Sequence, residues 1–137
     1  MRVTQDFRGQ HDAAMTLVDD IRLSSELLCR SADSERAGIV AAQLGQLTDL
    51  LQLHFALEDR LLYPALMAAP DDLVSATARR FFDEMGDIGP AYTTFAAAWT
   101  SPAAIERAPI RFHTQSEAIF TALATRIAHE DAELYPL

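Results

Sequence analysis

The sequence predicts an all-α fold, an up-down-up-down bundle of four helices built from two similar helical hairpins. Three observations predict it. Glycine and proline are scarce, at 5 and 6 of 137 residues, and the prolines stand mostly at the ends of helix-like segments. No window shows the polar–apolar alternation and β-branched content of a strand. Four long segments instead repeat apolar residues at helical spacing with short connections between them, as a single bundle domain over residues 1–137 requires.

Polar residues and a proline mark the expected ends of the first two helices. We expect the first helix from about Thr4 to about Cys29. The stretch Ser-Ala-Asp-Ser at residues 31–34 then supplies a turn and N-cap candidates. The second helix is expected from about Ser34 to Met67, because Pro70 follows closely.

The third and fourth helices are separated by a proline-flanked connection. The third opens at Pro70 with two aspartates in its first turn, where the helix dipole favours them, and reaches about Trp99. Gly86, Gly89 and Pro90 fall in its middle, so we expect a kink or break there. After a connection from Ser101 to Pro109, the fourth helix runs from near Ile110 to Tyr135.

Composition excludes several classes of function. With 11 basic and 20 acidic residues the net charge is −9, which repels phosphate backbones, so we expect no nucleic-acid partner. The single cysteine, Cys29, excludes a disulfide framework or a thiolate cluster. No apolar run approaches the ~20 residues of a membrane span, and the N-terminus lacks a signal-peptide pattern, so we expect a cytoplasmic protein. No nucleophile motif or phosphate loop occurs, and we expect no enzyme activity.

Four ionisable residues fall on helix faces that are otherwise apolar. At 100° per residue, His11 lies in the middle of the apolar face of the first helix. His54 and Glu58 lie on the core face of the second helix, where we also expect Leu61, and Glu130 lies inside the apolar stripe of the fourth. A carboxylate buried without a partner costs several kcal/mol. Glu58 and Glu130 therefore need a cation, a hydrogen-bond network or local access to water.

An internal repeat relates two of these positions. Residues 54–64, HFALEDRLLYP, align with residues 126–136, RIAHEDAELYP, at an offset of 72, and six of the eleven positions are identical. Two related hairpins packed about a pseudo-twofold axis would bring Glu58 and Glu130 together. Carboxylate-bridged dimetal bundles have that arrangement.

With these features the sequence resembles the hemerythrin-like, or HHE cation-binding, domain family over almost the whole chain. The residues that carry the resemblance are His11 early in the first helix, His54-x-x-x-Glu58 followed by Leu-Tyr-Pro, and the second Leu-Tyr-Pro after Glu130. The resemblance implies a four-helix bundle around a non-haem di-iron centre. The duties it implies are reversible oxygen binding and the sensing of oxygen, iron or redox state.

Matched position by position, the first half of the implied centre is complete and the second half is not. His11, His54, Glu58 and Glu130 take metal-ligand positions. Arg126 stands where the family has a histidine, and Met85 stands where the second half would mirror His11. The remaining donors hold one non-haem ion, with iron, manganese and zinc all suited to them, or hold none. Three residues remain candidates for completing the site, namely Glu84, Arg126 and His129.

Two hypotheses of function follow. The first is a metal-binding domain for storage or sensing, with a diatomic ligand such as oxygen at an open position. The second is a metal-free interaction or regulatory module in which Arg126 neutralises the buried carboxylates. That module would bind a separate protein, or a second copy as a homodimer, through its acidic surface and the Pro102–Pro109 connection. Because 137 residues leave no room for an output domain, we expect any signal to pass to a separate protein.

Overall fold

The computed structural model describes residues 2–137, and every regular element in that range is a helix. In chain order these are α1 (Arg2–Arg30), α2 (Ser34–Leu57), η1 (Glu58–Leu62), α3 (Tyr63–Met67), α4 (Asp72–Met85), α5 (Ile88–Ala98), α6 (Pro102–Arg107), α7 (Pro109–His129) and η2 (Glu130–Leu134). The elements η1 and η2 are single π-helical turns. The predicted all-α class is confirmed.

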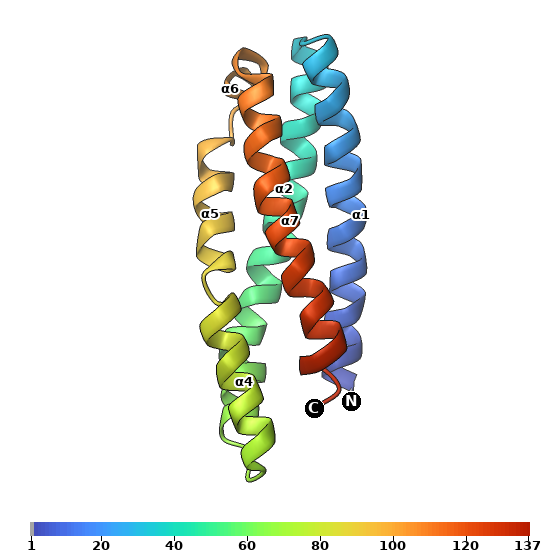
Figure 1. The fold of residues 1–137 in the computed structure, drawn as a ribbon. Helices are drawn as coiled ribbons and strands as arrows, with labels where there is room; N and C mark the ends of the chain where they lie inside the picture. The colour runs from blue at the N-terminus through green and yellow to red at the C-terminus, as the bar shows by residue number, and fades with distance from the viewer. Residues whose placement is uncertain (1) are drawn as a thin grey trace.

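Four rods lie side by side and alternate in direction (Figure 1). The first is α1, the second runs through α2, η1 and α3, the third through α4 and α5, and the fourth through α7 and η2. Both chain ends lie at the same end of the bundle (Figure 1). α1 packs against α2 and α7, and α5 packs against the same two helices, so their apolar faces meet in one core cluster. A second cluster, which includes Phe7, Leu62 and Phe81, lies toward α4.

The break predicted in the third rod is confirmed. α4 ends at Met85 and α5 begins at Ile88. In a continuous helix the ring of Pro90 would clash with the carbonyl of Gly86, four residues earlier. As the third residue of α5, Pro90 instead stands where a backbone N–H has no helical partner. The same break leaves the carbonyl of Met85 at a helix end, where another group can use it.

The connection from Ser101 to Pro109 has a regular structure that the sequence analysis did not predict. It contains α6, which packs against α2 and buries Ile105 completely. Pro102 stands in the first turn of α6, where proline is favoured. The apolar Ile105 is the signal for this short helix, since its burial fixes the segment on the bundle.

The two π turns begin at the two glutamates that the repeat relates. The N–H of Tyr63 donates to the carbonyl of Glu58, and the N–H of Tyr135 donates to that of Glu130 at 2.8 Å. In an uninterrupted α-helix Tyr63 would lie about 140° around the axis from Glu58. The wider π turn rotates Tyr63 and Tyr135 into the bundle. It also rotates Leu61 outward, so Leu61, predicted in the core, is 57% exposed.

No helix in the range that the structure describes, residues 2–137, is long and apolar enough to cross a bilayer.

Candidate metal centre

The four residues predicted as metal ligands meet inside the bundle. His11 comes from α1 and His54 from α2, whereas Glu58 and Glu130 are the first residues of η1 and η2. All four residues are at most 1% exposed. The two Nε2 atoms of the histidines lie 3.0 Å apart. His54 Nε2 lies 2.9 Å from Glu58 Oε1, and His11 Nε2 lies 3.3 Å from Glu130 Oε1.

The outer nitrogens of both imidazoles are held by oxygen atoms. His11 Nδ1 lies 3.0 Å from Asp131 Oδ1, and His54 Nδ1 lies 2.6 Å from Gln10 Oε1. Because both oxygens accept, we assign a proton to each Nδ1, which donates. Each neutral ring then directs the lone pair of its Nε2 at the other ring and at a carboxylate. A proton or a metal ion between the two rings would relieve the opposition of these lone pairs.

The two histidines differ in how readily they take up a second proton. Burial lowers the pKa of His11, but Glu130 and Asp131 outweigh it and raise that pKa above its ordinary value. Burial and the neighbouring charge of His11 lower the pKa of His54 to about 4. Of the two rings, His11 therefore keeps a second proton to a higher pH than His54 does. Metal binding releases protons from ligands of this kind.

The donor set fits one metal ion. His11, His54 and Glu130 each offer one ligand atom, and these atoms lie within 4.8 Å of one another. Glu130 Oε1 is buried and accepts no hydrogen bond. Histidines that bind metals typically donate the other ring N–H to a carboxylate or carbonyl, as His11 and His54 do here. Mixed imidazole and carboxylate ligation suits iron, manganese or zinc.

Arg126 brings a buried positive charge to the same cluster. Its side chain is 3% exposed. Nη2 donates to Glu58 Oε1 at 3.3 Å and Nε donates to Glu130 Oε2 at 3.4 Å. Nη1 donates to the carbonyl of Met85 at 3.3 Å, and the guanidinium carbon lies 4.4 Å from the centroid of the Phe55 ring. Although burial opposes it, attraction from Glu130 and Glu58 raises the pKa of Arg126, which stays charged.

Two tyrosines complete the hydrogen bonds of the carboxylates, and each tyrosine belongs to the other hairpin. Tyr63 donates to Glu130 Oε2, and Tyr135 donates to Glu58 Oε2, both at 3.1 Å. The hydroxyl of Tyr135 also lies 2.9 Å from His11 Nε2. Burial, together with the nearby carboxylates, raises the pKa of both phenols, so they remain protonated donors.

Of the three residues that were candidates for completing the site, one lies at it in the structure. Arg126 contacts both carboxylates, whereas Glu84 is exposed. The side chain of His129 is 46% exposed and pairs loosely with Glu133 at 3.9 Å. Met85 contributes a backbone carbonyl rather than its side chain.

Sequence reasoning missed four contributors to the centre, namely Gln10, Asp131 and the two tyrosines. Their roles depend on contacts between different helices. The tyrosines carried a usable signal, because each follows a core glutamate by five residues in both copies of the repeat. Asp131 carried none, since its repeat counterpart, Asp59, is exposed and makes no such contact.

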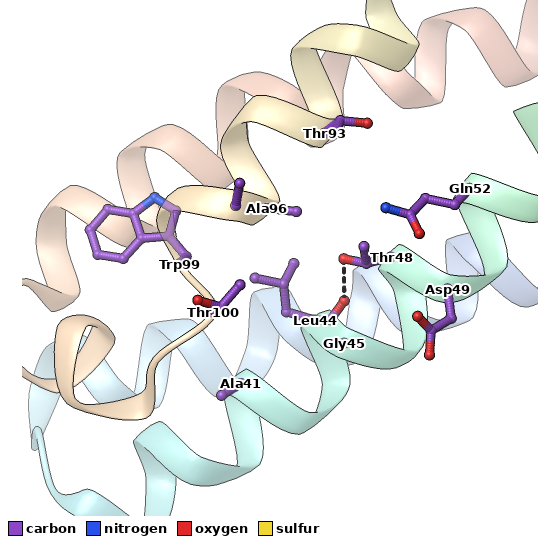
Figure 2. A pocket seen from close by; sticks show the side chains of 11 residues that line it. Ala41, Leu44, Gly45, Thr48, Asp49, Gln52, Thr93, Ala96, Trp99 and Thr100 are labelled. Atoms are coloured by element: carbon purple, nitrogen blue, oxygen red, sulfur yellow. Dashed lines mark hydrogen bonds between the residues drawn. The ribbon is translucent and has the colours of Figure 1, made fainter.

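Two grooves lie outside the centre. One, about 400 Å³, runs between α2 and α5, with Leu44 and Thr48 on one wall and Ala96 and Trp99 on the other (Figure 2). Thr48 donates there to the carbonyl of Leu44 at 2.7 Å (Figure 2). None of the residues that line this groove belongs to the centre.

The second groove, about 430 Å³, lies where η1 and α3 face α4. We call it the Tyr63 groove, because Tyr63 forms part of its wall beside Asp59, Met67 and Phe82. Tyr63 also contacts the centre, so one side chain connects this groove with Glu130.

A family model described as hemerythrin HHE cation binding domain matches residues 2–137. Searches of curated proteins and of solved structures found no match.

Proposed function

The chain belongs to the hemerythrin HHE cation-binding family, whose domains bind metal ions, usually iron, and on that basis we propose that it holds one non-haem iron ion for the sensing or storage of oxygen, iron or redox state. Its ligands are His11, His54 and Glu130, with Glu58 beside them. The observation that carries this proposal is the 3.0 Å separation of the two buried Nε2 atoms. Two imidazoles aimed at each other suit a cation better than any apolar or neutral core group.

The protein orients the metal ligands and buries them away from solvent. Asp131 and Gln10 fix the orientation of the two imidazoles, and Tyr63 and Tyr135 hold the carboxylates. When bound, iron supplies an electron-rich centre that takes a diatomic ligand such as oxygen. The proposed role is binding rather than turnover. The signal passes to a separate protein or to a second copy of the chain, in the cytoplasm.

Metal content tests the proposal. Protein loaded with ferrous iron under anaerobic conditions and freed of unbound metal should carry about one equivalent by elemental analysis. His54→Ala should carry a small fraction of that amount. The matched control is His129→Ala, because His129 is exposed and outside the centre, and it should bind as much as the unaltered protein. Iron well below one equivalent in the unaltered protein would refute the proposal.

The second candidate, a metal-free interaction or regulatory module, is favoured by the contacts of Arg126 with both buried carboxylates. In that case the arginine neutralises the buried carboxylates without a metal ion. The two candidates differ in one thermal measurement. Under the first, ferrous iron raises the midpoint of unfolding by mass action, and under the second it leaves the midpoint unchanged.

A further inference from the structure

Arg126 and His54 are equivalent positions of the internal repeat. Each stands four residues before the glutamate that starts a π turn. His54 Nε2 contacts the glutamate of its own hairpin, Glu58, at 2.9 Å. Arg126 Nε likewise contacts the glutamate of its own hairpin, Glu130, at 3.4 Å. The guanidinium therefore lies in the half of the centre where the second hairpin would otherwise supply an imidazole.

The atoms around the guanidinium are those that a cation prefers. They are Glu58 Oε1, Glu130 Oε2 and the carbonyl oxygen of Met85. The carbonyl is available because the third rod breaks after Met85. The face of the Phe55 ring covers the guanidinium at 4.4 Å. Arg126 thus uses the oxygens that a second metal ion would need.

Building on the proposed function, we infer that Arg126 is the resident cation of the second half-site and restricts the chain to a single metal ion. Both buried carboxylates face the one guanidinium, at 3.3 Å for Glu58 and 3.4 Å for Glu130. Glu58 Oε1 lies between the two half-sites, 2.9 Å from His54 Nε2 and 3.3 Å from Arg126 Nη2. A second divalent ion could enter only by displacing the guanidinium of Arg126. Displaced, that guanidinium would lose its three acceptors, Glu58, Glu130 and the Met85 carbonyl. Arginine keeps its charge at every accessible pH, so the place stays filled.

The experiment compares metal stoichiometry in variants that differ at this position. Arg126→His removes the guanidinium and supplies an imidazole. A double variant adds Met85→His, which supplies the counterpart of His11. The control is Arg80→His, the same substitution at a half-exposed arginine that pairs with Glu133. All are loaded anaerobically with ferrous iron beside the unaltered protein, and bound iron and circular dichroism are measured for each.

We expect Arg126→His, or the double variant, to bind about one equivalent more than the unaltered protein, and Arg80→His to bind no more. A variant could be unfolded without iron. If iron restores its helical circular dichroism and the folded variant then carries the additional equivalent, that result also supports the inference. Folded variants that bind no additional iron overturn it. The unaltered protein gives a test that depends on no variant, because saturation at two equivalents overturns the inference and leaves the proposed function intact. A different result would separate the two ideas the other way. If the unaltered protein binds no iron and the Arg126→His variant binds iron, the inference is supported and the proposed function is refuted.

Discussion

The phenol of Tyr63 donates a hydrogen bond to Glu130, the glutamate of the opposite hairpin, at 3.1 Å. Tyr135 does the same for Glu58 at the same distance. The repeat therefore produces a reciprocal pair of contacts across the centre. These contacts exist only because a π turn separates each tyrosine from the glutamate before it.

Removing one of these donors should weaken the fold. Tyr63→Phe leaves Glu130 Oε2 with the 3.4 Å contact to Arg126 alone. Since hydrogen bonds to charged groups contribute about 1.5–3 kcal/mol, we expect a loss of that size in the free energy of unfolding of the metal-free protein. Urea denaturation at neutral pH measures it. A change below about 0.5 kcal/mol would mean that the phenol contributes packing only.

Arg126→Gln should destabilise the metal-free protein far more than an exposed substitution does. It leaves two buried carboxylates without their shared cation, which typically costs about 3–5 kcal/mol. The matched control is Arg80→Gln, where the pair with Glu133 is half exposed and should contribute no more than about 1 kcal/mol. Equal losses for the two variants in urea denaturation would contradict the role given to Arg126.

The π turn predicts opposite behaviour for two adjacent leucines. Leu62 is 4% exposed and Leu61 is 57% exposed. Leu62→Ala should therefore cost about 2–5 kcal/mol, as buried leucine truncations do, whereas Leu61→Ala should stay within about 0.5 kcal/mol of the unaltered protein. Thermal or chemical unfolding distinguishes them. A continuous α-helix here would make Leu61→Ala the more damaging change.

The orientation of His11 should matter for metal affinity. Asp131→Asn weakens the acceptor at Nδ1 while it preserves shape. Changes to such outer partners usually lower metal affinity about 10–100-fold. Asp59→Asn is the control, because Asp59 occupies the same repeat position but is exposed. Competition with a chelator of known iron affinity should show the loss for Asp131→Asn alone.

Alkaline pH should reveal the burial of Tyr92, which lies outside the centre. Burial raises the pKa of Tyr92 to about 12, although its hydrogen bond with Thr48 opposes the rise. Above pH 10 the unfolded chain loses this proton before the folded protein does, so the stability that Tyr92 contributes falls as pH rises. Between pH 9 and 11 the stability advantage over Tyr92→Phe should shrink by about 1 kcal/mol. Parallel urea-denaturation profiles for the two proteins would contradict this.

The large features of the fold could be predicted from the sequence because they rest on local physical chemistry. Helical periodicity fixed the four rods, and Pro90 fixed the break in the third, since its ring excludes a continuous helix whatever packs around it. The four buried residues predicted as metal ligands were recognisable because each interrupts an apolar face. The six identical positions of the repeat were enough to predict that Glu58 and Glu130 lie together.

The remainder of the centre depends on geometry that periodicity does not encode. A constant rotation of 100° per residue assumes an α-helix throughout, so it placed Leu61 inside and did not predict the contact of Tyr63 with Glu130. The positions of Gln10 and Asp131 follow from how α1 and η2 meet, which a pattern along one helix cannot show. The contact between Arg126 and the Met85 carbonyl requires both the break in the third rod and its register against α7.

The depth of the centre has a kinetic consequence. His11, His54, Glu58 and Glu130 are at most 1% exposed, so an ion can neither arrive nor depart while the helices stay closed. Its residence time is then set by how often the bundle opens. Above a modest chelator concentration the release rate should become independent of that concentration. Tyr63 lies between the Tyr63 groove and Glu130, since it lines the one and donates to the other.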